Sequence, residues 1–434
     1  MSSFNPQAEQ LNEQLAAINP AVNEMLAERG KSIFFPAKGI LGQSADAKGK
    51  NINATIGTAL EDDGSPLCLP CIKEMINVDP AAAFLYAPSY GNPKLRDEWK
   101  SMILKKNPSL ADKPISRPVV AQALTHALSI AGYLFLDAGD ELILPDLFWG
   151  NYNLIFKEHF GAKYRTFNTF KDGGFDIPAM TEAINAKTPG KKVLLLNFPN
   201  NPTGYTVTKA EVTQLKNALL AAAEAGNKLV VMIDDAYFGL VYKAGIYEES
   251  IFADLADLHE NILAVKIDGA TKEDYVWGFR VGFITYGIKG GTTEFYSALE
   301  AKTAGAIRGN ISNAPAISQA LLLKAFTHPE YEAQKADKKS ILKARYDKLT
   351  QILAAHPEYS EAFEAMPYNS GYFMCVKLNG AEPEAVRQIL LEDYSTGLIA
   401  TMDLIRVAFS STPAAQLEEI FSNLYQAVLK VKQG

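Results

Sequence analysis

The stretch 268–282 reads DGATKEDYVWGFRVG and contains a lysine and an arginine whose spacing could support chemistry. Lys272 and Arg280 lie eight residues apart, with glycines around the arginine. A lysine amine condenses with an aldehyde only when neutral, so it needs burial or a nearby positive charge to lower its pKa. Arg280 could supply that charge and could also bind an anionic group such as a phosphate. The alternative is a solvated loop, because two acidic residues follow the lysine.

A pair of carboxylates ends another apolar run, 230–233, in the motif Asp234-Asp235-Ala236-Tyr237. A carboxylate at the end of a buried strand is costly to desolvate unless it meets a cation. Successive strand residues point to opposite faces, so Asp234 and Asp235 should face different sides of the sheet. The alternative is an acidic turn.

A carboxamide and an indole follow two further apolar runs. Asn201 lies in the segment NNPTG, and a carboxamide fixed at a strand end can donate to a phenolate oxygen. A plain turn is the alternative, because N-P and T-G are turn dipeptides. Trp149 lies in the segment WGNY and offers a wide face for stacking on an aromatic ring. Core packing is the ordinary role of a tryptophan, and Phe148 is a second candidate for stacking.

Two more segments could bind anions. Arg406 lies within the apolar run 405–409, where a buried guanidinium needs an anionic partner from elsewhere in the chain or from a ligand. A structural salt bridge is the alternative. Thr125 lies at the start of a helical run that continues to Ala131, and helix N-termini bind phosphate through free N–H groups and the helix dipole.

The elements that must position these residues alternate between strands and helices, which is typical of a mostly parallel sheet covered on both faces. Ligands bind to such sheets in the loops at the strand ends. Helix 209–225 is the clearest helix, and after Pro329 the pattern changes to that of a smaller α+β domain. We expect an arm and part of the small domain in 1–60, a large domain in 61–325 and a small domain in 326–434. The predicted strands are 119–124, 141–144, 192–197, 229–233, 262–267 and 280–286.

Composition limits the class of protein. The chain has 434 residues, is 48% hydrophobic and carries a net charge of −7 without a basic run, which argues against binding nucleic acid or an anionic membrane surface. Three cysteines are too few for a disulfide framework, and the single pair Cys68 and Cys71 has no second pair to complete a zinc site, so we expect no metal. The N-terminus has no basic and apolar leader pattern, and we expect a cytoplasmic protein.

Three more motifs complete the set: Gly57 in TIG, Tyr86 in YAPSYG, and Arg308 in RGNISNAP. In their order along residues 51–409, the motifs together resemble those of the class I/II aminotransferases, which are pyridoxal-phosphate (PLP) enzymes of fold type I, and are nearest to the aspartate and aromatic amino acid aminotransferases. The resemblance implies the α/β fold of that type and PLP as the cofactor.

The resemblance also implies a role for each residue. Lys272 would hold PLP as a Schiff base and act as the general base, and Asp234 would hold the proton of the pyridine nitrogen. The ring oxygen would be bound by Asn201 and Tyr237, and the ring would stack on Trp149. The phosphate would be bound by Thr125, Thr271, Arg280 and, from a neighbouring subunit, Tyr86. The substrate would meet Gly57, Arg406 and, from the neighbouring subunit, Arg308.

The sequence departs from the family pattern at several positions. Gly269 replaces a hydroxyl residue three positions before the lysine, and Tyr152 replaces the histidine of the family's W-G-N-H. Ala123 and Leu124 precede Thr125 where the family has Gly or Ser and a small residue. Tyr90 lies close enough to Tyr86 to compete with it for the same role.

The predicted function is transfer of an amino group from an aspartate-like or aromatic L-amino acid to a 2-oxo acid such as 2-oxoglutarate, by a homodimer with shared active sites. The alternative is a lyase or decarboxylase on the same fold, because the fold and the cofactor do not determine which Cα bond breaks. A PLP-binding regulator is disfavoured, because Lys272 is present and no DNA-binding domain precedes residue 50.

Overall fold

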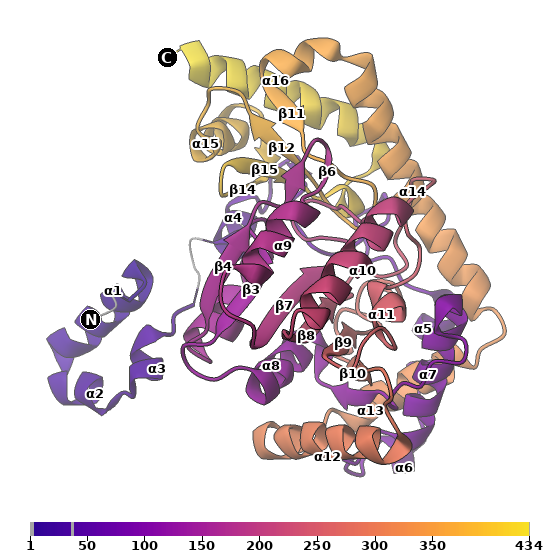
Figure 1. Cartoon of the computed structure of the whole chain (residues 1–434). Coiled ribbons are helices and arrows are strands. Elements are labelled where there is room, and N and C mark those ends of the chain that lie inside the picture. Colours follow the sequence, from indigo (N-terminus) through magenta and orange to yellow (C-terminus); the bar gives the residue numbers. More distant parts are fainter. Residues whose placement is uncertain (1–3, 36–38, 434) are drawn as a thin grey trace.

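The computed structural model describes residues 4–35 and 39–433, and a seven-stranded sheet forms its centre (Figure 1). The strand order is β2-β10-β9-β8-β7-β3-β4, and β10 alone runs opposite to the other six strands of this sheet. The prediction of a mostly parallel sheet is therefore confirmed. The strands are β2 (Val119–Ala121), β3 (Glu141–Pro145), β4 (Lys163–Phe167), β7 (Lys191–Asn197), β8 (Lys228–Asp234), β9 (Ile262–Asp268) and β10 (Gly282–Gly287).

Alternate residues of these strands pack into two apolar cores, one on each face. In β8, Val231 and Ile233 belong to the core that includes α9 and α10, whereas Met232 belongs to the core that includes α8 and α12. Because both faces are covered, the strands are apolar at consecutive positions. The helices around the sheet are α8 (Ala123–Phe135), the π-helix η2 (Asn153–Glu158), α9 (Ile177–Asn185), α10 (Lys209–Glu224), α11 (Ile251–Leu255), α12 (Thr293–Asn310) and α13 (Ala316–Phe326).

Helix α10 matches the predicted helix 209–225 to within one residue. It begins at a capping box, in which the Thr208 hydroxyl accepts from the Glu211 N–H and the Glu211 carboxylate accepts from the Thr208 N–H. The predicted strands 119–124 and 280–286 are shorter in the structure. Ala123 already begins α8, and Arg280 has a left-handed φ of 56°, which a strand does not accommodate.

A four-stranded antiparallel sheet follows in the C-terminal part, in the order β11-β12-β15-β14, as the α+β pattern after Pro329 predicts. Its strands are β11 (Phe363–Ala365), β12 (Met374–Leu378), β14 (Ile399–Thr401) and β15 (Leu404–Val407). It is joined by α14 (Tyr331–Ala355), η3 (Pro357–Glu361), α15 (Pro383–Asp393), β13 (Thr396–Gly397), η4 (Phe409–Ser411), η5 (Ala414–Gln416) and α16 (Leu417–Gln433). The two-residue strand β1 (Ile52–Asn53) pairs with β13. The three-part division of the chain stays a prediction.

The N-terminal segment consists of three helices that stand apart from the central sheet (Figure 1). They are α1 (Pro6–Ile18), α2 (Pro20–Met25) and α3 (Glu28–Ser32), and they leave Ile18 and Met25 exposed. The remaining elements are α4 (Ile40–Asp46), α5 (Pro70–Glu74), α6 (Pro80–Ala83), α7 (Pro93–Lys106), η1 (Pro108–Leu110), β5 (Phe170–Lys171) and β6 (Gly174–Phe175). Among the described helices, none is both long enough and apolar enough to cross a membrane.

Candidate active site

A cavity of about 280 Å³ lies at the carboxyl ends of β7, β8 and β9 and reaches across to β15. Its volume is close to the lower end, roughly 300 Å³, of small-molecule sites. All but two of the predicted site residues line it, although they are spread over 350 positions of the sequence. These residues are Gly57, Thr125, Trp149, Asn201, Asp234, Tyr237, Thr271, Lys272, Arg280 and Arg406.

Lys272 lies in the loop 269–281 that joins β9 to β10, which we call the lysine loop. Its Nζ lies 5.5 Å from the centroid of the Tyr237 ring, and its carbonyl oxygen accepts a hydrogen bond of 2.7 Å from the Tyr372 hydroxyl. Burial, with a smaller contribution from the nearby Arg280 guanidinium, lowers the pKa of Lys272 to about 8. A substantial share of the amine is therefore neutral near pH 7.5, as an attack on an aldehyde requires.

Asp234 and Asp235 point to opposite sides of β8, as strand alternation predicts. Asp234 is buried in the cavity, where its carboxylate accepts from the Tyr152 hydroxyl at 2.5 Å and from the Ala236 N–H at 3.1 Å. Asp235 instead pairs with Lys266 and accepts from the Ser250 hydroxyl at 2.6 Å. Burial raises the pKa of Asp234 to about 6, because within the described part of the chain no cation pairs with it.

The structure also separates Lys272 from the other lysine of the region. Lys266 is fully buried and binds Asp235 and Asp268 on the far side of the sheet from the cavity. Its Nζ also lies 4.4 Å from the centroid of the Phe238 ring. A lysine held by two carboxylates keeps its proton, and the pKa of Lys266 is raised. Lys266 is therefore no rival as an amine nucleophile.

One end of the cavity is suited to a phosphate. The N-terminus of α8 opens into it without a side-chain cap, so the first-turn N–H groups remain available. The hydroxyl of Thr271 is buried there and has no hydrogen-bond partner among the described residues. Thr125 and the Arg280 guanidinium line the same cavity, and an anion would satisfy all of these donors together.

Steric crowding explains why position 269 has a glycine and no side chain. A Cβ built on Gly269 would lie 2.6 Å from the Val281 carbonyl oxygen and 3.2 Å from the Leu124 side chain. Gly282 is equally restricted, because its Cβ would lie 2.6 Å from the backbone of Ala123. The lysine loop thus packs closely against the start of α8, and Leu124 occupies the space beside position 269. The hydroxyl that the family pattern has there is lost because a side chain does not fit.

Arg406 lies on β15 and is buried against Phe373, with its guanidinium carbon 4.2 Å from the ring centroid. It donates at 3.2 Å to the Asn201 side-chain oxygen and at 3.2 Å to the Thr55 carbonyl oxygen, and its Nε has no partner in the described structure. Neither Asp403 nor any other described carboxylate forms a salt bridge with it, so the structural ion pair considered from the sequence is not found. A buried guanidinium of this kind is complementary to a carboxylate ligand.

The structure also distinguishes Trp149 from Phe148, the two candidates for stacking on an aromatic ring. Trp149 lines the cavity, whereas Phe148 packs against Tyr164 and Tyr152, with ring centroids 5.6 and 6.2 Å apart. Phe148 is therefore not the residue available for stacking. Tyr152 is the contact of Asp234 that sequence reasoning missed. Its replacement of histidine was visible, but its bond to Asp234, 82 residues away, was not.

Tyr86 and Arg308 lie outside the cavity of the single chain. Tyr86 is 91% exposed, and Arg308 is exposed near the end of α12, where it donates to the Ser312 hydroxyl at 2.8 Å. Tyr90 instead packs under the Arg96 guanidinium at 5.3 Å. The predicted roles of Tyr86 and Arg308 require a second subunit, so they stay predictions.

Comparison with known proteins agrees with this geometry. The family model described as "Aminotransferase class I and II" matches residues 50–424. The chain belongs to this family. Its members use pyridoxal phosphate to transfer amino groups between amino acids and 2-oxo acids, and the chain is accordingly an aminotransferase.

The similarity to individual members is moderate. The aspartate aminotransferase of Geobacillus stearothermophilus is 25% identical over 349 residues, which are 79% of this chain and 78% of that protein. The solved aminotransferase of Anaerococcus prevotii superposes with a TM-score of 0.80 at 26% identity, over 93% of this chain and 98% of that chain. The aspartate aminotransferase from the cytoplasm of Saccharomyces cerevisiae has a TM-score of 0.76 at 20% identity, over 92% and 98% of the two chains, and supports the fold alone.

Proposed function

We propose that the cavity binds pyridoxal phosphate covalently at Lys272 and catalyses transamination of aspartate-like or aromatic amino acids. The observation that carries the proposal is that one cavity contains two groups, the half-buried Lys272 and the buried Asp234, whose pKa values are shifted in opposite directions. Lys272 has a lowered pKa, and Asp234 is a desolvated carboxylate that forms no ion pair with a cation of the described residues. A protonated pyridine nitrogen would provide the missing cation, and an aldehyde would use the neutral amine.

The other residues of the cavity fit the rest of the cofactor. The phosphate would bind the N-terminus of α8, Thr125, Thr271 and Arg280. Asn201 already uses its side-chain oxygen to accept from Arg406, which leaves its N–H groups to donate to the ring oxygen together with Tyr237. Trp149 would hold the ring plane by stacking.

These positions suggest a separate role for each residue of the cavity. When bound, pyridoxal phosphate supplies an electron sink that stabilises negative charge at the substrate Cα. Asp234 would hold the proton of the ring nitrogen, and the hydrogen bond from Tyr152 orients that carboxylate. Lys272 Nζ would act as the general acid and base that accepts the proton from the substrate Cα and holds it for transfer. Arg406 binds the substrate α-carboxylate beside Gly57 and so orients the Cα–H bond.

We further propose 2-oxoglutarate as an acceptor and a homodimer as the active form. The names of relatives support dicarboxylic substrates, because several of them are aspartate aminotransferases. A dimer is supported by exposed apolar side chains beside the predicted inter-subunit tyrosine, since Phe84 and Leu85 are 85% and 68% exposed next to Tyr86. A cytoplasmic location is supported by three cysteines that are all free.

A half-reaction separates transamination from lyase or decarboxylase chemistry. The purified holoprotein is mixed with one amino acid and no 2-oxo acid, and the cofactor is identified by its absorbance and mass. We expect conversion to pyridoxamine phosphate, with release of one 2-oxo acid per site, from aspartate, glutamate, tyrosine or phenylalanine. Release of an amine, an alkene acid or carbon dioxide with unchanged pyridoxal phosphate would contradict the proposal.

Replacing Arg308 with alanine should selectively weaken dicarboxylic substrates. If this arginine reaches the neighbouring subunit's cavity, it supplies the second cation that a distal carboxylate needs while Arg406 binds the α-carboxylate. A charged hydrogen bond of this kind contributes roughly 1.5–3 kcal/mol. The kcat/KM for aspartate, glutamate and 2-oxoglutarate should therefore fall on the order of 10–150-fold. Phenylalanine, measured in its own half-reaction, should be affected much less.

Two controls make this test specific. Lys302→Ala removes another exposed cation from α12 and should leave every kcat/KM near the wild-type value. Mixing Lys272→Ala with Arg308→Ala subunits should produce hybrids that regain dicarboxylate activity, because each hybrid has one intact site. Equal losses for phenylalanine and aspartate, or no recovery on mixing, would show that Arg308 has another role.

A further inference from the structure

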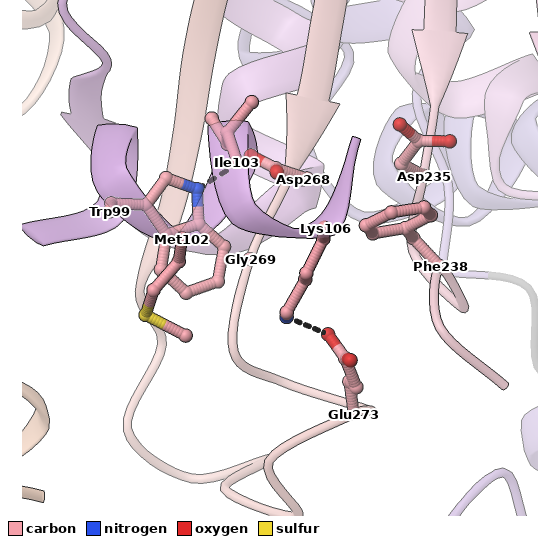
Figure 2. Close-up of a pocket in the computed structure, with 9 residues that line it drawn as sticks. All are labelled: Trp99, Met102, Ile103, Lys106, Asp235, Phe238, Asp268, Gly269 and Glu273. Carbon is pink, nitrogen blue, oxygen red and sulfur yellow. Dashed lines mark hydrogen bonds and ion pairs between the residues drawn. The ribbon is translucent and has the colours of Figure 1, made fainter. Parts of the chain in front are cut away.

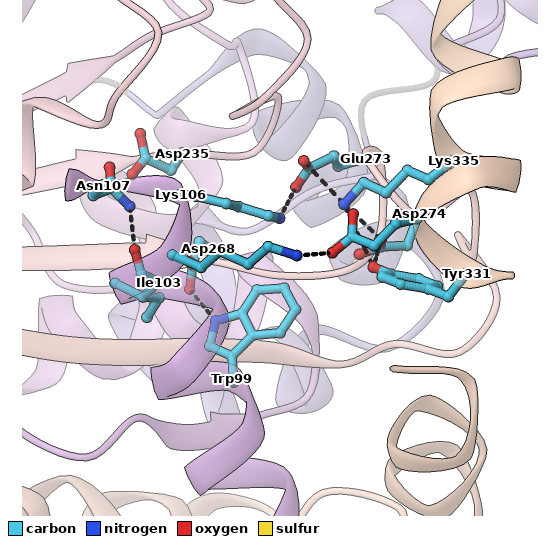
Figure 3. Close-up of polar contacts among 12 residues, drawn as sticks. Trp99, Ile103, Lys106, Asn107, Asp235, Asp268, Glu273, Asp274, Tyr331 and Lys335 are labelled. Carbon is cyan, nitrogen blue, oxygen red and sulfur yellow. Dashed lines mark hydrogen bonds and ion pairs between the residues drawn. The ribbon is translucent and has the colours of Figure 1, made fainter. Parts of the chain in front are cut away.

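A buried ionic cluster is formed by the two residues that follow Lys272 in the lysine loop, and neither of them lines the cavity (Figure 3). Glu273 and Asp274, the two acidic residues that suggested a solvated loop in the sequence, are its centre. The exposed fraction of their side chains is 13% and 0%. Both point toward helices α7 and α14 and not toward solvent (Figure 3).

Four contacts hold these two carboxylates. Lys106 Nζ, at the end of α7, lies 2.6 Å from Glu273 Oε2. Lys335 Nζ, in the second turn of α14, lies 2.9 Å from Glu273 Oε1 and 3.0 Å from Asp274 Oδ1. The Tyr331 hydroxyl donates to the same Asp274 oxygen. Burial alone would raise the pKa of Glu273, but Lys106 and Lys335 outweigh it and lower the pKa to about 2, so this residue stays ionised.

The cluster also contacts the loop that follows Asp234. Gly239 has a φ of 87°, and a Cβ built on it would lie 2.3 Å from Glu273 Oε1. A side chain at position 239 would therefore displace the Glu273 carboxylate. Lys106 Nζ lies 5.9 Å from the centroid of the Phe238 ring as well. The lysine loop, the loop after β8 and both helices thus meet at Glu273.

The cluster leaves no space for a ligand. The cavity beside it, lined by Trp99, Met102, Lys106, Asp235 and Glu273 among others, measures about 10 Å³ (Figure 2). Such a volume accommodates about one water molecule. The charged groups therefore satisfy one another. Burying ion pairs in this way contributes little net stability compared with apolar packing, whereas it specifies one arrangement of the groups.

Helix α14 connects this cluster to the other end of the active site. Ten residues beyond Lys335, the buried Arg345 donates to the carbonyl oxygens of Ser410, at 2.5 Å, and Leu60, at 2.7 Å. Ser410 lies four residues after Arg406. One helix is therefore fixed both to the residues that follow Lys272 and to the segment that follows Arg406. Figure 1 shows its course along one side of the molecule.

We propose that Lys335 is a positioning residue for Lys272: by binding Glu273 and Asp274 together it holds the lysine loop against α14 and so places the Lys272 amine relative to Arg406. The inference rests on the proposed role of Lys272. A displacement of about 1 Å at a reacting group costs up to roughly 10²-fold in rate. Loss of the Lys335 ammonium should therefore lower kcat about 10–100-fold, counted per cofactor-loaded site.

The test compares Lys335→Met with a matched control. Lys105→Met removes an ion pair of 2.7 Å between Lys105 and Glu332, which joins the same two helices but is exposed and does not touch the lysine loop. Hydrogen–deuterium exchange of the holoprotein should increase in the peptide covering 269–281 for Lys335→Met and not for Lys105→Met. The pH at which the visible absorbance of the bound cofactor changes should move in Lys335→Met alone, and Lys335→Arg should recover most of kcat.

The following results would overturn the proposed positioning role of Lys335. Unchanged exchange in 269–281 with an unchanged absorbance midpoint would overturn the proposal, even if the thermal stability fell. Equal effects in Lys105→Met would overturn it too, because they would reflect helix docking in general. If Lys335→Met does not fold, Lys335→Met with Asp274→Asn keeps the buried charges balanced and carries the same expectations. If wild-type protein shows no cofactor absorbance at Lys272, the proposed function fails, whereas the exchange measurement still tests the contact.

Discussion

Replacing Lys272 with alanine should abolish turnover while leaving a folded protein that still binds pyridoxal phosphate. The amine would hold the cofactor and move the proton between the substrate Cα and the cofactor carbon, and no other described lysine lines the cavity. A positioned general acid and base contributes on the order of 10²–10⁴-fold in rate. The residual kcat should therefore fall by at least that factor. The phosphate contacts of α8, Thr271 and Arg280 do not involve the amine and should keep the cofactor bound.

Three measurements check this expectation. Borohydride reduction followed by peptide mass spectrometry should attach the cofactor to the peptide containing Lys272 in the wild-type protein and to no peptide of the variant. The spectrum of the variant should change when an amino acid is added and then persist without product release. Lys289→Ala, which removes an exposed lysine beyond the opposite end of β10, should retain wild-type kcat. Normal turnover by the Lys272→Ala protein would contradict the proposed role of Lys272 as the cofactor-binding lysine.

The arrangement of the cavity could be predicted from sequence because its residues follow strands. Asn201, Asp234 and Lys272 each come after an apolar run, and parallel strands bring their carboxyl ends to one edge of the sheet. The β8 register places Asn197 beside Asp234, and the Asn197 carboxamide donates to the Asp234 carbonyl oxygen at 2.8 Å. The local sequence pattern and the geometry of a parallel sheet are enough to predict that these residues lie together.

Contacts between distant segments could not be predicted in this way. Nothing in the sequence around Tyr152 indicates that its hydroxyl meets Asp234, and the absent side chain at position 269 is explained only by Val281 and Leu124. The acidic pair after Lys272 left a solvated loop open as an alternative for the same reason, and its buried contacts exclude that alternative. Its partner Lys335 lies more than 60 residues along the chain, on a helix whose packing no local pattern specifies.

Residues predicted to serve a neighbouring subunit form a third class. Tyr86 and Arg308 were predicted from motifs, and their exposure in the single chain agrees with a site completed by a second copy. Exposure alone does not distinguish such residues from ordinary surface side chains, which is why the hybrid experiment with Arg308→Ala is needed.

Asp234→Asn and Asp235→Asn should have opposite effects on activity and stability. Asparagine at 234 can still accept from Tyr152 but cannot hold the proton of the pyridine nitrogen, so the electron sink is weakened. Loss of one preorganised electrostatic group costs on the order of 10²–10³-fold in kcat. Asparagine at 235 keeps the contact with Ser250 and leaves Lys266 with Asp268, so kcat should change less than about threefold while the buried ion pair weakens and the free energy of unfolding falls.

The two variants should also differ in the free energy of unfolding of the cofactor-free protein. Burial raises the pKa of Asp234 to about 6 from 3.8, so ionising it opposes folding, and the cost grows as pH rises from about 4 to about 6 and is constant above. At pH 7.5 the cofactor-free Asp234→Asn protein should be more stable than wild type, by up to about 3 kcal/mol, and the gain should vanish near pH 4. Denaturant unfolding at several pH values measures it. Equal losses of kcat in both variants, or a destabilised Asp234→Asn protein at pH 7.5, would mean that the two carboxylates do not divide their roles as β8 orients them.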